Sequence, residues 1–270
     1  MSFTNKVVLI TGAATGLGAA IALGFAKLNA TLCITDISEA NLLKTKTECE
    51  GLSKETVLEV IADLRKDEDV ARIVDSVLKA FGKIDVLVNC AGIVKAARLQ
   101  DSDIIAKFDE IISVNLRAAI VMTRYALPAL IASKGCIINI SSVASRLITR
   151  NILPYNISKA GLLNFTKCAA FELAPHGVRV NCISPGAVKT NLWINAGATE
   201  EEHHTIWDTV IEQTPLKKSI EGEEVAELTI YLASDKAASI TGSDFVIDAG
   251  LLLGTVGTVG VPESIVKNVS

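Results

Sequence analysis

Short apolar runs alternate along this chain with longer stretches that have helical periodicity. The runs are rich in β-branched residues and almost continuously apolar, which is typical of strands covered by helices on both faces. We expect strands at 7–11, 31–35, 57–62, 84–89, 136–140, 179–183 and 244–247, and helices near 16–29, 39–51, 67–81, 101–132, 155–174 and 221–234. This alternation predicts an α/β fold: a Rossmann-like, doubly wound parallel sheet of about seven strands with right-handed crossovers.

No repeat, low-complexity segment or Pro/Ser-rich linker divides the chain, so residues 1–270 are interpreted as a single domain. Two segments interrupt the alternation. Residues 186–220 form a long insert that contains Trp193 and Trp207, and the tail 251–270 is apolar but rich in Gly and Val. Long connections in compact domains often bind ligands or cover them, so we expect 186–220 to be a substrate loop.

Composition narrows the class of protein. Half of the residues are apolar, 21% are charged and the net charge is −4, which supplies a core and argues against disorder. No basic stripe is present, so nucleic acid is not an expected partner. No polybasic amphipathic helix or apolar run of about 18 residues is present, so no membrane partner is expected. The six cysteines lack paired spacing and the N-terminus lacks a signal sequence, which favours a reduced, cytoplasmic location, with an organelle left open.

A glycine-rich turn follows the first expected strand. Residues 11–18 read Thr-Gly-Ala-Ala-Thr-Gly-Leu-Gly, and a helix comes next. Glycines allow the backbone N–H groups to approach a pyrophosphate, and the helix N-terminus adds partial positive charge. Because both the strand and the helix are present, the turn predicts a dinucleotide site rather than a plain strand-to-helix connection.

The second expected strand is followed by Asp36, and no Arg or Lys occurs at 36–38. A carboxylate there accepts hydrogen bonds from ribose hydroxyls and repels a 2′-phosphate. We therefore expect NAD rather than NADP as the cofactor. The alternative is that Asp36 only caps a turn or a helix.

A reactive group is expected where Tyr155-Asn-Ile-Ser-Lys159 opens a helix after Pro154. Positions i and i+4 share a helix face, and a nearby cation lowers the pKa of a phenol from about 10. Alone, this pair could equally be a surface aromatic–lysine contact. However, Ser142 closes the preceding strand and Asn89-Cys-Ala-Gly92 closes another, and both strand ends belong to the carboxyl edge of the sheet.

At this point the chain resembles the short-chain dehydrogenase/reductase family, in its compact single-domain form. The resemblance extends from Lys6 to about Gly250, with the motif residues in the family's order and spacing. One departure is Asp248-Ala-Gly250, where many relatives have Asp-Gly-Gly. The resemblance implies the Rossmann-like fold, hydride transfer with a nicotinamide cofactor, and the site residues that follow.

The resemblance implies four catalytic residues. Tyr155 is the general acid in reduction and the base in oxidation, and Lys159 holds the nicotinamide ribose and lowers the Tyr155 pKa. Ser142 donates a hydrogen bond to the substrate oxygen. Asn115 holds a water that links Lys159 to solvent, unless it merely bonds helix backbone.

It also implies a set of cofactor contacts, with Tyr155 and Lys159 contributing to both sets. The phosphate turn comprises Gly12, Thr15, Gly16, Leu17 and Gly18, and the ribose and adenine contacts are Asp36, Ile37, Asp63 and Leu64. The adenosine side is contacted by Asn89, Ala91 and Gly92, and the nicotinamide side by Pro185, Gly186, Val188 and Thr190.

Histidines give weaker signals. His203 and His204 follow three glutamates, but adjacent residues of a helix point in different directions, so a solvated helix start is expected and no metal site. His176 between Pro175 and Gly177 is explained by a helix end. Trp193 and Trp207 either line a substrate pocket or anchor the insert.

The expected function is interconversion of a secondary alcohol and a ketone with NAD(H). The insert has only Lys189, Lys217 and Lys218 as cations, which favours an uncharged, fairly hydrophobic small-molecule substrate: steroid-like, aliphatic or 3-hydroxyacyl. The alternatives are a catalytically idle NAD-binding regulatory or scaffold protein of the same fold, or another Rossmann-like enzyme such as a methyltransferase or epimerase. By resemblance, the helices at 101–132 and 155–174 are expected to pack against other copies in a homo-oligomer, a tetramer.

Overall fold

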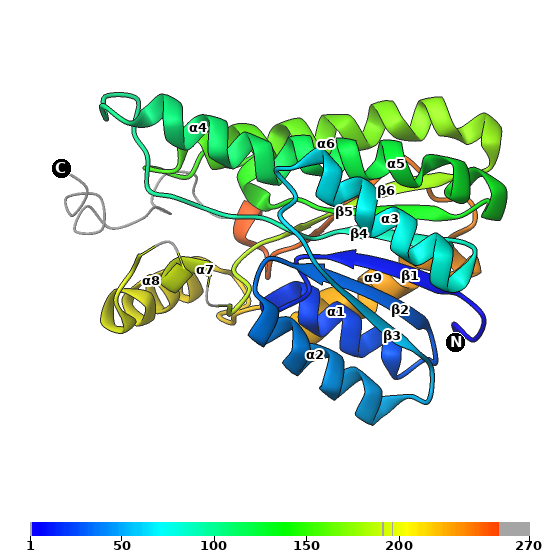
Figure 1. The fold of residues 1–270 in the computed structure, drawn as a ribbon. Coiled ribbons are helices and arrows are strands. Elements are labelled where there is room, and N and C mark those ends of the chain that lie inside the picture. The colour runs from blue at the N-terminus through cyan, green and yellow to red at the C-terminus, as the bar shows by residue number, and fades with distance from the viewer. Residues whose placement is uncertain (1, 191, 196, 254–270) are drawn as a thin grey trace.

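The structure is a computed structural model that describes residues 2–190, 192–195 and 197–253. Its centre is a seven-stranded sheet in the order β3–β2–β1–β4–β5–β6–β7, in which every pairing is parallel (Figure 1). The strands are β1 (Val7–Thr11), β2 (Thr31–Asp36), β3 (Val57–Ile61), β4 (Val86–Asn89), β5 (Cys136–Ile140), β6 (Arg179–Pro185) and β7 (Asp244–Ile247). The predicted doubly wound α/β fold is confirmed.

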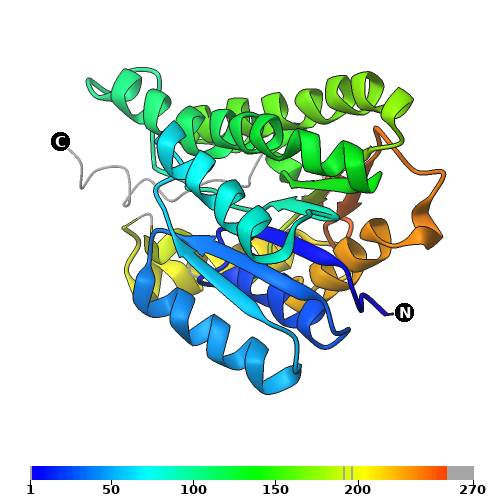
Figure 2. The same ribbon diagram turned by 45° about the vertical axis from the view of Figure 1, so that its right-hand side comes forward.

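Helices cover both faces of this sheet (Figures 1 and 2). On one face lie α1 (Gly16–Ala26), α2 (Glu39–Leu52) and α9 (Gly222–Ala233); on the other lie α3 (Asp67–Phe81), α4 (Ile104–Ile112), α5 (Ala118–Ser133) and α6 (Leu153–Leu173). Alternate side chains of β1 explain the two layers, because Val8 and Ile10 join the cluster under α1 and α9, whereas Val7 and Leu9 join the one under α3 and α5.

The long helix expected at 101–132 is two helices joined by a π-helical turn, Ser113–Arg117. A continuous helical pattern does not distinguish i→i+4 from i→i+5 hydrogen bonding, so this break could not be predicted from the sequence. Single π-helical turns inside helices are frequently found at functional sites, and this one contains Asn115. The expected insert 186–220 holds two helices, α7 (Leu192–Asn195) and α8 (Glu200–Gln213).

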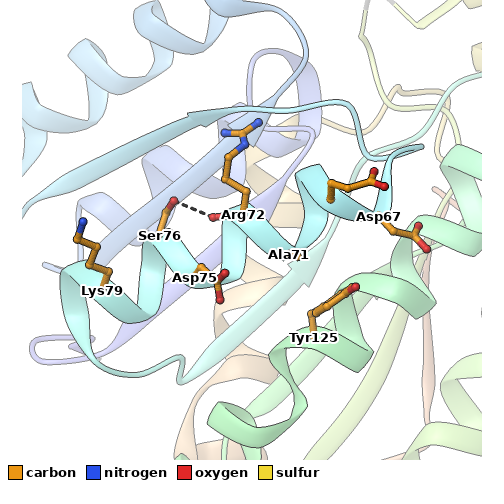
Figure 3. A pocket seen from close by; sticks show the side chains of 8 residues that line it. Asp67, Ala71, Arg72, Asp75, Ser76, Lys79 and Tyr125 are labelled. Atoms are coloured by element: carbon orange, nitrogen blue, oxygen red, sulfur yellow. Dashed lines mark hydrogen bonds between the residues drawn. The ribbon is translucent and has the colours of Figure 1, made fainter.

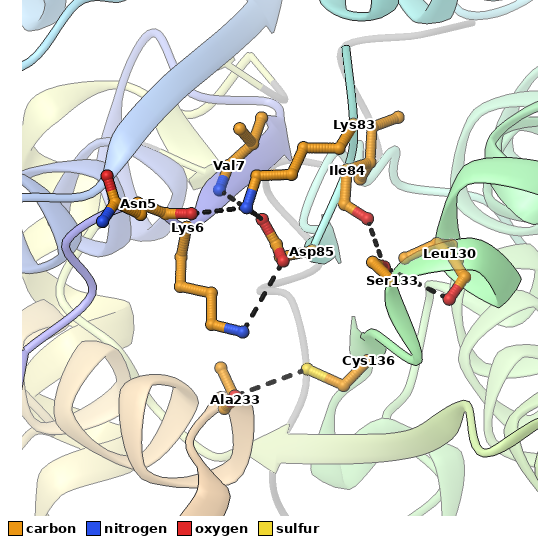
Figure 4. Close-up of polar contacts among 10 residues, drawn as sticks. All are labelled: Asn5, Lys6, Val7, Lys83, Ile84, Asp85, Leu130, Ser133, Cys136 and Ala233. Atoms are coloured by element: carbon orange, nitrogen blue, oxygen red, sulfur yellow. Dashed lines mark hydrogen bonds and ion pairs between the residues drawn. The ribbon is translucent and has the colours of Figure 1, made fainter. Parts of the chain in front are cut away.

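Asp85 fastens the amino edge of the sheet (Figure 4). One of its carboxylate oxygens accepts a hydrogen bond from the Val7 N–H at 2.8 Å, and the carboxylate forms ion pairs with Lys6 (3.6 Å) and Lys83 (2.9 Å). Asp85 is buried, so its charge is stabilised by these partners rather than by water. This edge lies opposite the carboxyl ends of the strands, where a doubly wound sheet binds its ligands.

The strand order reverses between β1 and β4, which are neighbours although α1, β2, α2, β3 and α3 separate them in the chain. In doubly wound sheets, the ligand lies beyond the carboxyl ends of the strands at this reversal. The topology therefore brings together the turn after β1 and the segment after β4.

Ala249, where the resemblance implies that many relatives have glycine, has a left-handed conformation with φ 51°. A Cβ atom disfavours this region. Ala249→Gly is expected to raise the free energy of unfolding by about 1 kcal/mol, the released strain outweighing the greater freedom of glycine in the unfolded chain. Urea unfolding followed by circular dichroism measures it.

Gly250→Ala is the matched control. Gly250 has φ 84°, and a Cβ there would lie 2.9 Å from Cγ of Pro215, so this variant is expected to be destabilised. Equal or lower stability of Ala249→Gly would show that the position carries no strain.

Candidate active site

The glycine turn joins β1 to α1 at the carboxyl edge. Gly12 and Gly16 have φ values of 68° and 57°, and a Cβ on Gly12 would lie 2.6 Å from the Cα of Ala91. A Cβ on Gly18 would lie 2.0 Å from the Gly12 carbonyl oxygen. Thr15 precedes α1, but its side chain accepts no hydrogen bond from the first N–H groups of the helix. The turn thus has the close backbone and the helix N-terminus that a pyrophosphate requires.

Thr11 ties this turn to the end of β4. Its Oγ1 accepts hydrogen bonds from the N–H groups of Cys90 (3.1 Å) and Ala91 (3.2 Å). Gly92 follows and is exposed, and a Cβ on it would lie 3.4 Å from Nζ of Lys159. A Cβ at this position would thus be in van der Waals contact with the Lys159 ammonium, whereas glycine leaves the space beside it open.

Asn89 is buried, in contrast to Ala91 and Gly92. Its Nδ2 donates to Oδ1 of Asn139 on β5 at 2.8 Å and to Thr123 on α5 at 3.4 Å. Asn89 thus holds the strand ends together, and the partly exposed Ala91 and exposed Gly92 are better placed for contact with a cofactor.

Asp36 ends β2 beside the glycine turn. Its Oδ2 accepts from the Ala14 N–H at 3.1 Å and its Oδ1 from the Ser38 N–H at 3.0 Å. The alternative that Asp36 forms a turn therefore has structural support, since it accepts hydrogen bonds from Ser38 and from the turn that follows β1. Contact with a ribose remains a prediction for this residue. The side chain is partly exposed and has no ion-pair partner within the described ranges, and the neighbouring Ile37 is 62% exposed.

Asp63 and Leu64 follow β3. The hydrogen bonds of Arg65 to both carboxylate oxygens of Asp63, with Nη2–Oδ2 at 2.8 Å, hold the pKa of Asp63 below its usual range. Leu64 packs against the apolar cluster under α3. The Asp63 carboxylate is thus fixed in orientation but shared with a cation.

Tyr155 and Lys159 lie one helical turn apart in α6, which begins at Leu153 with Pro154 in its first turn. The Lys159 ammonium lies 5.6 Å from the centroid of the Tyr155 ring and donates to the Ile140 carbonyl at 2.9 Å. The residue is buried, which lowers the pKa of its ammonium from 10.5 to about 8. The predicted pairing of the two side chains is therefore present.

The phenol of Tyr155 is buried in the chain without cofactor. Burial raises its pKa to about 12, and a hydrogen bond with Ser142 offsets only part of this rise. That Lys159 and a bound nicotinamide together lower the pKa of Tyr155 remains a prediction for the cofactor-bound protein.

Ser142 stands between the end of β5 and a short 3₁₀ turn. Its Oγ accepts a hydrogen bond from the Ala144 N–H at 3.1 Å and bonds to Tyr155. Both hydroxyl groups therefore converge at one place, with Lys159 behind them. This is the arrangement needed to hold one oxygen of a substrate and to exchange a proton with it.

Asn115 lies in the π-helical turn and is buried. Its Oδ1 accepts from the Ile93 N–H at 2.8 Å, and its Nδ2 donates to the Ile93 carbonyl at 2.9 Å and to Ser158 Oγ at 3.1 Å. The side chain thus fastens the loop after β4 to α6. Holding a water remains a prediction for this residue.

The segment after β6 closes the other side of the site. A Cβ on Gly186, which follows Pro185, would lie 2.8 Å from the Cα of Asp248. Val188 is buried and forms a bridge with Ile220, and the Thr190 side chain lies beside Gly16, where a Cβ would be 3.4 Å from its Cγ2. The fold therefore brings the phosphate turn next to the segment predicted to hold the nicotinamide.

A family model described as enoyl-(acyl carrier protein) reductase matches residues 12–252, which include every predicted site residue from Gly12 to Thr190. A crystal structure of a short-chain dehydrogenase/reductase of unknown function from Caenorhabditis elegans, with cofactor, is 33% identical with a TM-score of 0.88, covering 94% of this chain and 97% of that one. The chain belongs to the short-chain dehydrogenase/reductase family.

Two relatives show the range of chemistry near this dehydrogenase/reductase. The 3-oxoacyl-acyl-carrier-protein reductase of Thermotoga maritima is 36% identical over 257 residues, covering 94% of this chain and all of the relative. The D-beta-hydroxybutyrate dehydrogenase of Rhizobium meliloti is 36% identical over 256 residues, covering 91% of this chain and 98% of the relative. Both names describe reactions between an alcohol and a ketone.

A nicotinamide cofactor fits the residues of this short-chain dehydrogenase/reductase. The carboxyl edge offers positions where any Cβ would collide, a helix N-terminus, an acidic side chain at the end of β2 and a buried ammonium, all within the segments described above. When bound, the cofactor supplies or accepts the hydride.

Sequence reasoning missed Thr11 and Ser158. Ser158 Oγ accepts from Asn115 and donates to the Tyr155 carbonyl at 2.8 Å, so it couples the π-helical turn to the tyrosine's own backbone. Its position next to Lys159 was visible, but its partner lies 43 residues away in the chain. For Thr11 only its place at the strand end could have given a hint.

Two hollows of this dehydrogenase/reductase lie elsewhere. One, of about 520 Å³, lies on the outer faces of α3 and α5 between Asp67, Arg72, Lys79 and Tyr125 (Figure 3). The other, of about 480 Å³, is at the amino edge near Asp85. None of the predicted site residues lines either hollow, so neither hollow is the candidate site.

The structure corrects the expectation for one histidine: His203, expected in a solvated helix start, is buried on α8, whereas His204 is exposed. His176 precedes Gly177, which has φ 74°, at the end of a short 3₁₀ turn. No group of three metal-binding side chains occurs in the described part of the chain, and no helix there is long and apolar enough to cross a membrane. Trp207 is buried on α8, whereas the side chain of Trp193 lies outside the described residues.

Proposed function

We propose that this protein interconverts a secondary alcohol and a ketone with NAD(H). The convergence of Ser142, Tyr155 and Lys159 at the carboxyl edge carries the proposal, because it joins a hydrogen-bond donor, a proton-exchanging group and a cation at one place. Ser142 holds the substrate oxygen while Tyr155 gives it a proton in reduction or takes one in oxidation. Lys159 holds the ribose, and Asn115 keeps the loop after β4 in place.

The substrate is proposed to be uncharged and fairly hydrophobic. Tyr155 packs against a cluster that includes Val94, Val143, Leu147 and Ile152, and the helix α8 adds Ile206 and Val210 to it. A charged group would lose its hydration against this surface. Screening a panel of secondary alcohols with NAD and NADP, by absorbance of the reduced cofactor, tests the function. Absence of turnover with intact cofactor binding would favour an idle cofactor-binding protein instead.

The cofactor is proposed to be NAD, on the strength of Asp36. Catalytic efficiency is expected to be about tenfold or more higher with NAD(H) than with NADP(H), because a carboxylate repels a phosphate that carries nearly two negative charges. Asp36→Ala is expected to narrow that preference, and Asp75→Ala, on the outer face of α3, to leave it unchanged. Comparison of kcat/KM for both cofactors measures this, and an equal or reversed preference in the unsubstituted protein contradicts the assignment.

The protein is also proposed to be a homo-oligomer, a tetramer. Helices α4, α5 and α6 expose apolar side chains that a monomer leaves in water: Ile105, Tyr125, Ile157 and Phe171, of which Phe171 is 85% exposed. Light scattering at micromolar concentration is expected to give a tetrameric mass. Phe171→Glu is expected to lower that mass, while Leu43→Glu on α2 is not. A monomeric mass for the unsubstituted protein rejects the proposal.

A further inference from the structure

Helix α8 presents one buried face to the cluster beside Tyr155. Thr199 and Glu202 fix its start through a capping box, and His203, Ile206, Trp207 and Val210 are its buried residues. Their spacing of three and four places them on the same side of the helix. Ile206 and Val210 belong to the cluster against which Tyr155 packs, so His203 lies on the face turned toward that cluster.

The hydrogen bond from Trp207 indicates which ring nitrogen of His203 carries the proton. The indole Nε1–H donates to His203 Nε2 at 3.0 Å, with the two rings edge to face at a centroid separation of 5.8 Å. An indole nitrogen can only donate, so Nε2 must be the unprotonated nitrogen of a neutral imidazole. The proton of His203 is therefore on Nδ1, and the Trp207 contact holds the ring in place.

The Nδ1–H group of His203 has no hydrogen-bond partner in the described part of the chain, although the side chain is only 8% exposed. Buried donors are almost always paired in native proteins, because an unpaired donor loses its hydration without compensation. The two histidine rings do not explain it, since His203 and His204 meet only edge to face at 6.1 Å. An oriented donor without an acceptor, next to the apolar cluster of the site, is a feature that a ligand oxygen can complete.

We propose that His203 Nδ1–H binds a second oxygen of the substrate, remote from the carbon that exchanges hydride. This inference rests on the proposed alcohol–ketone function and narrows its substrate to a molecule with two oxygen functions. Because the imidazole is neutral and three glutamates open α8, the favoured acceptor is an uncharged carbonyl, hydroxyl or ether oxygen rather than a carboxylate. An ester or thioester of a 3-hydroxy acid, a hydroxy ketone and a diol have this chemistry, and a simple aliphatic alcohol lacks it.

The test compares probes with and without a second oxygen function. Cyclohexanol is compared with 1,2-, 1,3- and 1,4-cyclohexanediol, and methyl 3-hydroxybutanoate with 2-hexanol, in which CH2 groups replace the ester, and with 3-hydroxybutanoate, in steady-state oxidation. At least one neutral two-oxygen probe is expected to exceed its one-oxygen partner in kcat/KM by about tenfold, mainly through KM, which is the scale of one buried hydrogen bond. The charged 3-hydroxybutanoate is expected to fall below its methyl ester.

Two substitutions assign this preference to His203. His203→Phe keeps a buried ring without a donor. It is expected to bring the ratio of kcat/KM between a two-oxygen probe and its one-oxygen partner close to one, with little change for the one-oxygen probes. His203→Gln keeps an N–H donor and is expected to restore part of the ratio, which also covers the case in which the Phe variant fails to fold. His204→Phe, at the adjacent exposed position, is the control and is expected to leave the ratio unchanged.

The outcomes separate the two proposals. If the unsubstituted protein turns over the one-oxygen probes but shows no preference for any two-oxygen probe, or if the preference survives in both His203 variants, His203 is not a substrate subsite and the alcohol–ketone function stands. If no probe reacts with either cofactor, the function itself is overturned and the subsite with it.

Discussion

Tyr155→Phe is expected to abolish turnover while leaving cofactor affinity largely intact. The phenol oxygen is the group proposed to exchange a proton with substrate, and such general acid–base catalysis contributes about a hundred- to ten-thousand-fold. The ring keeps its packing in the Phe variant, so the fold is expected to persist. Steady-state rates and fluorescence titration with the cofactor measure the two effects separately. Near wild-type rates in this variant would assign the proton to another group.

The pH dependence gives a second measure of the same residue. Oxidation needs the phenolate, so its rate is expected to rise with pH, whereas reduction needs the phenol and its rate is expected to fall. In the chain alone the pKa of Tyr155 is raised to about 12. A cationic nicotinamide beside the phenol favours the phenolate, so the oxidation profile is expected to titrate below the free phenol value of about 10. A profile that does not titrate below this value would mean that the cofactor charge does not reach Tyr155.

Lys159→Met is expected to lose turnover and cofactor affinity together, because the ammonium lies beside Tyr155 and is proposed to hold the ribose. The loss of affinity distinguishes it from Tyr155→Phe. Fluorescence titration of both variants under the same conditions provides the comparison. Unchanged cofactor affinity in the Lys159 variant would contradict the proposed role of the ammonium.

The same variant is expected to be more stable than the unsubstituted protein without cofactor. Burial lowers the pKa of Lys159 from 10.5 to about 8, which corresponds to about 3 kcal/mol lost on folding at neutral pH. In the variant the Ile140 carbonyl loses its hydrogen bond to the ammonium, which lowers the free energy of unfolding by about 1 kcal/mol. Between pH 8 and 10.5 the unfolded chain binds the extra proton, so the stability of the unsubstituted protein rises with pH and the advantage of the variant disappears. Thermal unfolding at pH 7 and pH 10 measures this.

The strands and the placement of Tyr155 beside Lys159 could be predicted from the sequence because both are local. Seven short apolar runs specify the sheet, and the spacing of Tyr155 from Lys159 puts them on one helix face. The contacts that position these groups are not local. Asp36 bonds to Ala14 and Asn115 bonds to Ile93, partners that lie 22 residues away in each case, and no periodicity marks either pair.

The π-helical turn shows the same limit at the level of backbone. The apolar pattern from α4 through α5 is continuous, and the change in hydrogen bonding at Ser113–Arg117 leaves no trace in it. The raised pKa of Tyr155 in the chain without cofactor could not be predicted for a related reason, because the sequence shows the nearby charge but not the depth of burial. Burial of His203 likewise becomes visible only when α8 is in place.

The strand order has a consequence for folding during synthesis. On the ribosome, β1, β2 and β3 emerge first and can pair with one another, but β1 must wait for β4 before its other edge is covered. Until Val86–Asn89 has left the exit tunnel, the half-made sheet ends in the bare apolar edge Val7–Thr11. An open edge of this composition pairs readily with other chains. The strand β1, which is central in the folded enzyme, is therefore an aggregation-prone edge strand in the nascent chain.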